Sequence, residues 1–305
     1  MVFFGTPQFA AEILQYLLEH SVSVVAVVTQ PDRPKGRSLE IAPSAVKQVA
    51  LSQIASTPIF QPEKASDPQF LEELAALGAD LFVVVVFGQI LSQKLLDIPP
   101  LGSINVHPSL LPKYRGAAPI HHALLNGDRI TGVSIQKIVK QLDAGDVLEQ
   151  VPFEIPPEMN LGELERALCA VSKPLLLSVI QRFANDAVSG TPQDPAQVTF
   201  APKFESEQGL INWHLSAAQL HNHIRAFAPR PGAWCWLPGS KRLKILRTSI
   251  ASGRGPIGDI TPQGLVYCGE GALQLLEVQP EGKKAMPVSD WLRGAKVKNL
   301  LHSTS

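Results

Sequence analysis

One short segment of the sequence carries residue types suited to acyl chemistry. Ser103-Ile104-Asn105-Val106-His107 alternates polar and apolar residues, a pattern that predicts a β-strand. Asn105 and His107 are two residues apart, so they point to the same side of such a strand. Pro108 cannot continue a central ladder, which puts both at the carboxyl end, where open α/β sheets bind ligands. An amide donor beside an imidazole can polarise a carbonyl group and relay a proton near neutral pH.

A carboxylate that could orient the imidazole stands further along the chain. Asp143 belongs to Leu142-Asp143-Ala144-Gly145-Asp146, which we interpret as a turn between the strand-like segments 132–139 and 147–155. A strand-end histidine can also serve only structure, and an aspartate in a turn often caps it. Spacing alone leaves both interpretations of Asn105, His107 and Asp143 open.

The segments around these residues predict two domains. The apolar, mostly β-branched run 80–86 is typical of a central parallel strand buried on both faces. Further strands are expected at 1–4, 22–28, 59–60 and 103–107, and helices at 8–19, 45–52, 71–77, 118–126 and 161–184. Strands that alternate with helices indicate a doubly wound α/β sheet.

The chain after residue 189 has a different character. Residues 190–206 are rich in Pro, Gly and polar residues and are interpreted as a linker. A helix near 217–226 is followed by short strand-like segments at 233–237, 244–250, 258–260, 264–268 and 271–278. Short strands separated by turns predict a small barrel. We therefore expect a catalytic domain over 1–189 and a second domain over 207–305.

Composition excludes several classes of protein. The chain has 305 residues, 45% of them hydrophobic and 18% charged, which excludes wholesale disorder. The sequence holds three cysteines with no C-x-x-C pair, so no disulfide framework, zinc finger or other metal site is expected. It has no G-x-G-x-x-G after the first strand, no Walker A lysine motif, no G-x-S-x-G and no H-E-x-x-H. It also has no apolar run near the roughly 20 residues of a membrane span, and we expect a soluble cytoplasmic protein.

Charge is distributed unevenly along the chain. Residues 1–200 hold 14 basic and 20 acidic side chains, whereas 201–305 hold 13 basic and 7 acidic ones. A basic second domain indicates a polyanionic partner, with nucleic acid the first candidate and ordinary solvating charge the alternative.

Longer motifs carry a resemblance to a known family. The segment SINVHPSLLPKYRGAAPIHHALLNGD, followed by TGVSIQKIVKQLDAGDVL, resembles the folate-dependent formyltransferases. The segments FFGTPQFA, VVTQPDRPKGR, IRAFAPRPGAW and VQPEGKKAM resemble the branch that formylates methionyl-tRNA, so the likeness runs nearly end to end. Only Met1 and Val2 precede FFGTP, fewer residues than is usual, so a shortened first strand is expected.

The resemblance implies a fold and a reaction. It implies a Rossmann-like domain that binds 10-formyltetrahydrofolate and an OB-like barrel that helps hold tRNA. The implied reaction moves the formyl group to the α-amine of methionyl initiator tRNA, without a metal. Asn105 and His107 would stabilise the oxyanion, and Asp143 would orient His107 and help move the amine's proton. We expect a monomer.

The resemblance also implies binding residues. Those for the folate are Ser109, Leu110, Leu111 and Pro112, together with Phe87, Gly88, Gln89, Ile90 and Leu91. Those for tRNA are Arg33, Lys35 and Arg37 in the loop 30–44, and Lys283 and Lys284 in the basic second domain. Two departures from the family pattern bear on tRNA: Ser38-Leu39-Glu40 replaces basic residues, and Arg230 stands where Trp is usual.

Two alternatives stay open at this stage. One is a different enzyme of the superfamily, either a sugar-amine formyltransferase or a 10-formyltetrahydrofolate hydrolase. The other is a catalytically inactive tRNA-binding homologue. The loop 30–44 and the basic second domain favour the tRNA enzyme over the first, and the intact Asn105, His107 and Asp143 argue against the second.

Overall fold

The computed structural model describes residues 1–35, 40–185, 188–295 and 297–301. It divides into two compact units. The first comprises Met1–Gly116, Gly132–Phe153 and Arg166–Phe200, and the second comprises Ala117–Thr131, Glu154–Glu165 and Ala201–Ser305.

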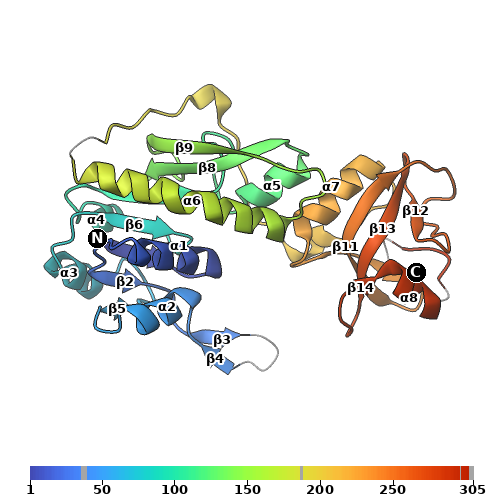
Figure 1. The fold of residues 1–305 in the computed structure, drawn as a ribbon, viewed down its shortest axis with the longest axis horizontal. Coiled ribbons are helices and arrows are strands. Elements are labelled where there is room, and N and C mark those ends of the chain that lie inside the picture. Colours follow the sequence, from blue (N-terminus) through green and yellow to red (C-terminus); the bar gives the residue numbers. More distant parts are fainter. Residues whose placement is uncertain (36–39, 186–187, 296, 302–305) are drawn as a thin grey trace. The chain divides into compact units, whose positions relative to one another are not determined.

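A seven-stranded sheet dominates the first unit (Figure 1). Its order is β5 (Ile59–Phe60), β2 (Ala26–Val28), β1 (Val2–Gly5), β6 (Phe82–Val85), β7 (Ser103–His107), β8 (Ile130–Lys137) and β9 (Val147–Glu154). The strands from β5 to β7 are parallel, and β8 is antiparallel to β7. The Rossmann-like, mostly parallel sheet predicted from the sequence is therefore confirmed.

The helices follow the predicted pattern closely. They are α1 (Gln8–Glu19), α2 (Ala45–Gln53), α3 (Pro68–Ala76), α4 (Gln93–Leu96), α5 (Pro119–Leu125) and α6 (Leu161–Phe183). The short α4 was not expected, and α3 begins earlier than residue 71 because Asp67 caps it and Pro68 occupies its first position.

Strand β1 has four residues, and pairing with it limits the length of the neighbouring strands β2 and β6. Val2 pairs with Ala26 and with Phe82, and Gly5 pairs with Val85. The predicted strands over 22–28 and 80–86 were therefore too long, because the paired residues extend only over 26–28 and 82–85.

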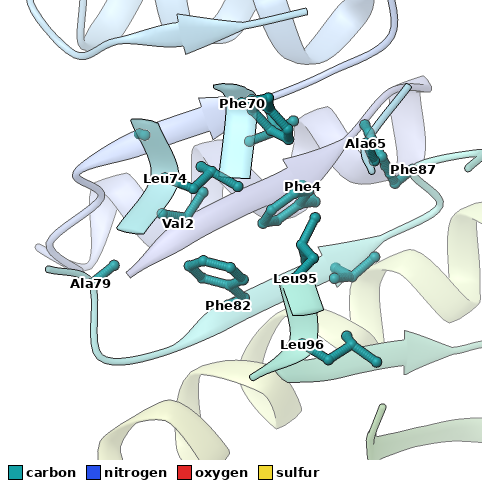
Figure 2. Close-up of a cluster of buried hydrophobic side chains, with 13 residues drawn as sticks. Val2, Phe4, Ala65, Phe70, Leu74, Ala79, Phe82, Phe87, Leu95 and Leu96 are labelled. Carbon is teal, nitrogen blue, oxygen red and sulfur yellow. The ribbon is translucent and has the colours of Figure 1, made fainter. Parts of the chain in front are cut away.

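The core beside β1 and β6 combines Phe side chains with Val, Ala and Leu (Figure 2). The Phe4 ring lies 5.2 Å from that of Phe82 and 5.5 Å from that of Phe87, measured between ring centroids. The contact between Phe4 and Phe87 packs the start of the segment expected to bind folate against β1.

The loop predicted over 30–44 contains a small hairpin. Strand β3 (Arg33–Lys35) pairs with β4 (Glu40–Ala42). The sequence prediction missed it because neither three-residue strand carries an apolar alternation. Arg37, Ser38 and Leu39 lie outside the described residues.

The second unit contains an antiparallel sheet. Its strands are β10 (Ala233–Leu237), β11 (Lys241–Ala251), β12 (Leu265–Tyr267), β13 (Ala272–Pro280) and β14 (Met286–Pro287), in the order β10-β11-β13-β12 with β14 on β13. Helix α7 (Ala217–Phe227) begins at a capping box made by Ser216 and Gln219. The strand predicted over 258–260 was wrong: Gly258 has a φ of +83°, and only isolated bridges form there. Helix α8 (Val288–Gly294) was not predicted.

None of the helices in the described residues is long and apolar enough to cross a membrane.

Candidate active site

Asn105 lines a cavity at the carboxyl end of β7. The cavity measures about 330 Å³, and its walls come from β6, β7, β8 and the segments that follow β6 and β8. The Asn105 amide makes no hydrogen bond to any described residue, and its side chain is only partly buried. An amide that is unpaired and open to a cavity is available to a ligand.

His107 is not among the residues that line this cavity, and it is buried, with an exposure of 4%. Its Nε2 is 2.9 Å from the carbonyl oxygen of Tyr114, and its Nδ1 is 3.7 Å from Oδ2 of Asp143. A carbonyl only accepts hydrogen bonds, so in the neutral ring Nε2 carries the hydrogen and Nδ1 is bare. Burial lowers the pKa of His107 despite the opposing effects of Asp143 and of the Tyr114 carbonyl. The neutral form is therefore favoured.

Asp143 lines the same cavity as Asn105. Its Oδ2 accepts the Gly116 N–H at 2.8 Å, and its Oδ1 accepts Nε2 of Gln136 at 2.9 Å. Its φ is +48°, a left-handed conformation that aspartate adopts more readily than most residues. The structure thus brings Asn105, His107 and Asp143 together, and the predicted turn over 142–146 is the element that delivers the carboxylate.

The segment Ser109–Pro112 is held by β8 and β9. Ser134 donates its hydroxyl to the Ser109 carbonyl at 2.6 Å and accepts the Leu111 N–H at 3.0 Å. Nε2 of Gln150 donates to the Leu111 carbonyl at 2.9 Å. Ser109 is buried, and its hydroxyl donates to the Lys113 carbonyl. Leu110 is partly buried, and Leu111 and Pro112 line a different recess from that of Asn105.

The segment Phe87–Leu91 reaches the cavity with its second half. Gln89, Ile90 and Leu91 line it, and the Ile90 side chain is 95% exposed. Phe87 is buried, and its carbonyl accepts the Thr6 hydroxyl and Nε2 of Gln30. Gly88 has a φ of +91°, which lets the chain turn from the core to the rim.

The residues expected to bind tRNA lie on exposed segments. Arg33 lies in β3, exposed, with Nη2 3.4 Å from Oε2 of Glu63. Lys35 ends β3, and its side chain is outside the described set, as is all of Arg37. Lys283 and Lys284 are exposed in the turn after β13, and Arg230 is exposed before β10.

Three further polar residues complete the site and were missed from the sequence. Gln136 is buried and donates to Asp143, and Ser134 is buried beside the 109–112 segment. Both interrupt the apolar residues of β8, a signal that could have found them. Gln193, in the predicted linker, donates to the Asp143 carbonyl at 2.9 Å. No sequence pattern indicates that long-range contact.

The described parts of the chain contain no group of three or more His, Cys, Asp or Glu side chains arranged to hold a metal ion.

Comparisons with known proteins agree with this architecture. A family model described as formyl transferase matches residues 1–180, and one described as formyl transferase, C-terminal domain, matches residues 203–296. One similar solved structure is an N-formyltransferase from Helicobacter canadensis in complex with folinic acid and dTDP-3-aminofucose. Its TM-score is 0.66 at 19% identity, and the match covers 92% of this chain and 98% of that protein's chain. HypX from Aquifex aeolicus in complex with tetrahydrofolic acid has a TM-score of 0.65 at 17% identity, covering 96% of this chain and 46% of its own.

Curated relatives are more similar. A methionyl-tRNA formyltransferase of Protochlamydia amoebophila is 47% identical over 302 residues, which span 96% of this chain and 94% of that protein. That of Moorella thermoacetica is 43% identical over 300 residues, which span 96% of both chains. The chain therefore belongs to the formyl transferase family and, within it, to the methionyl-tRNA formyltransferases.

Proposed function

We propose that this protein transfers the formyl group of 10-formyltetrahydrofolate to the α-amino group of methionyl initiator tRNA. The observation that carries the proposal is the Asn105 amide, which makes no hydrogen bond to a described residue and lines the same cavity as the Asp143 carboxylate, itself 3.7 Å from His107. Family membership indicates which reaction to expect. That reaction requires a hydrogen-bond donor for the developing oxyanion and an acceptor for a proton, and this arrangement of residues contains both.

The Asn105 amide stabilises the negative charge that develops on the formyl oxygen when the amine attacks. Removal of one such donor costs about 10²–10³ in turnover in other acyl-transfer enzymes. His107 was also expected in this role. Its Nε2 hydrogen is donated to Tyr114, so this geometry favours Asn105 as the oxyanion donor.

Asp143 and His107 accept the proton that the attacking amine loses. Bare Nδ1 and anionic Oδ2 face each other across 3.7 Å, and both are proton acceptors. A proton received by Asp143 and shared with Nδ1 satisfies both atoms. As the new C–N bond forms and the old one breaks, that proton is returned to the leaving nitrogen of tetrahydrofolate.

The cavity walls suit the folate. Ile90, Leu91, Ile138, Val139 and Leu142 supply apolar surface, and polar side chains such as Asn105, Gln136 and Asp143 line the rest. Flat heteroaromatic ligands favour such a lining. Residues 89–91 form one wall in this proposal, whereas Leu111 and Pro112 line a different recess.

The second unit holds tRNA in this proposal, as an OB-like barrel. Isolated bridges lead from β12 through Ile260 and Asp259 to Asn299, and from Leu301 back to β10. In this proposal these bridges complete the barrel that the antiparallel sheet begins. The Arg242 guanidinium lies 4.2 Å from the Trp234 ring centroid and 5.0 Å from that of Trp236. Basic and aromatic groups on one sheet are typical of nucleic-acid binding. Arg33, Lys35, Arg37, Lys283 and Lys284 add positive charge for the phosphates.

A formylation assay tests this proposal. The protein is incubated with 10-formyltetrahydrofolate and methionine-charged initiator tRNA, with charged elongator tRNA, a nucleotide-linked amino sugar, or no acceptor in parallel. We expect formylmethionine only on the initiator. Hydrolysis of the donor without transfer, or transfer to the amino sugar, would overturn the proposal.

A further inference from the structure

Gln193 makes an unusual number of contacts for a residue in a predicted linker. Its Nε2 donates to the carbonyl oxygens of Asp143 at 2.9 Å and of Gly145 at 2.7 Å. A longer contact of 3.5 Å joins Nε2 to Oε1 of Gln136. Its Oε1 accepts Nε and Nη2 of Arg115 at 3.0 and 2.8 Å. One amide therefore joins the 142–146 turn, strand β8 and the segment after Tyr114.

The chain around Gln193 is fixed on both sides. Thr191 exchanges backbone hydrogen bonds with Val147, and the Thr199 carbonyl accepts the Arg115 N–H at 2.9 Å. Residues 191–199 are therefore bonded to the first unit at both ends, and Gln193 is held between these attachments. A side chain with such a fixed backbone loses little conformational entropy when its hydrogen bonds form.

Arg115 determines how the Gln193 amide is oriented. The guanidinium can only donate, and the two carbonyls of the 142–146 turn can only accept. Only one orientation of the amide satisfies both sets of partners. Arg115 is 7% exposed, and none of the ion pairs among the described residues includes its guanidinium. Its buried charge is directed to this neutral amide.

Hydrogen bonds reach Asp143 from several residues. Arg115 donates to Gln193, and Gln136 donates to Oδ1 of Asp143. The two hydrogens of Gln193 Nε2 are directed to the carbonyls of Asp143 and Gly145, so the 3.5 Å contact with Oε1 of Gln136 is a longer, shared one. The residue after Arg115, Gly116, donates its N–H to the other carboxylate oxygen. Arg115 therefore contacts Gln193, which bonds the Asp143 carbonyl, and Gly116 bonds the Asp143 carboxylate directly.

We propose that Gln193, oriented by Arg115, is a positioning residue that holds the 142–146 turn so that Asp143 faces His107 during formyl transfer. The inference rests on the proposed function of the site. Asp143 occupies the left-handed region, where a residue other than glycine stays only if its surroundings hold it. Gln193 supplies that restraint from outside the turn.

The test is Gln193→Glu in the full chain. The substitution keeps the side chain's length and its contact with Arg115, but both of its oxygens can only accept, so neither carbonyl of the turn is satisfied. We expect kcat for formylation to fall 10- to 100-fold, the size of effect that a small misplacement of a catalytic group produces. The KM values for 10-formyltetrahydrofolate and charged tRNA should change less than threefold, because Gln193 lies in neither wall of the cavity.

Gln197→Glu is the matched control. It makes the same chemical change four residues later, on an exposed amide whose single hydrogen bond within the described residues is to Asp194. We expect its kcat to stay within twofold of that of the unaltered protein. Thermal unfolding of both variants is recorded alongside.

The outcomes separate two failures. A Gln193→Glu protein with kcat within threefold of the unaltered protein overturns the inference and leaves the proposed function intact. A loss of kcat with equally large rises in both KM values and a lower unfolding midpoint indicates a general structural role, which also overturns it. An unaltered protein that formylates no tRNA overturns the proposed function itself.

Discussion

Replacing Asp143 with asparagine keeps the size of the side chain and removes its charge. The carboxylate accepts one hydrogen bond on each oxygen, from Gly116 at 2.8 Å and from Gln136 at 2.9 Å. Asparagine has one acceptor oxygen, so its amide nitrogen must face one of these donors. One charge-assisted hydrogen bond is lost, which costs about 1.5–3 kcal/mol of stability. Nδ1 of His107 also loses the anion that faces it at 3.7 Å.

We expect the turnover of Asp143→Asn to fall by about 10²–10⁴, because the pair no longer accepts the amine's proton. The assay is single-turnover transfer to methionine-charged initiator tRNA, with urea unfolding of the same preparation. Asp146→Asn is the control, since its side chain makes no hydrogen bond among the described residues and should keep normal turnover. Turnover of Asp143→Asn within tenfold of the unaltered protein would refute the assigned role.

Three further predictions address pH, the folate wall and tRNA. Burial and the neighbouring His122 lower the pKa of His121 to about 4 from an ordinary 6.5. The unfolded chain therefore binds this proton first, and the free energy of unfolding should decrease as pH falls from about 6.5 to about 4. Urea titrations should show that the free energy of unfolding of His121→Phe decreases less over this pH range than that of the unaltered protein. An equal decrease in both proteins would show that His121 is not the cause. Ile90→Ala should weaken tetrahydrofolate binding about 5- to 30-fold, from about 1–2 kcal/mol of lost apolar contact, and leave thermal unfolding unchanged. Titration calorimetry measures the tetrahydrofolate affinity, and Ile250→Ala, at an exposed position of β11, is the control. An unchanged affinity of Ile90→Ala would show that Ile90 does not contact the folate. Replacing Lys283 and Lys284 with glutamine should lower the salt dependence of log K for tRNA binding by about 1–2, and an unchanged slope would exclude them from the tRNA contact.

The sequence predicted the parts of this molecule that local patterns determine. Alternation over 103–107 and Pro108 placed Asn105 and His107 correctly at a strand end, and the Gly-containing turn placed Asp143 between two strands. Strand lengths were overestimated at 22–28 because pairing with β1, and not β-propensity, decides where the ladder begins.

Contacts between segments that are distant in the sequence could not be predicted from local sequence patterns. The hydrogen bonds of Gln193 to Asp143 and Arg115 connect residues 50 and 78 positions apart. Pro and Gly around Gln193 indicated only a connecting segment, although its side chain lies at the centre of the site's hydrogen bonds. The unpaired state of the Asn105 amide, which supports a catalytic role over a structural one, likewise required coordinates.

The most direct test of the account compares Asn105→Ala and His107→Ala with the unaltered protein. Single-turnover formyl transfer to methionine-charged initiator tRNA is measured together with tetrahydrofolate affinity. We expect each variant to lose at least about 100-fold in transfer rate while binding tetrahydrofolate within about threefold of normal. Transfer at normal rates in both variants would contradict this expectation, since the reaction would then proceed without the two strand-end residues on which the site is built.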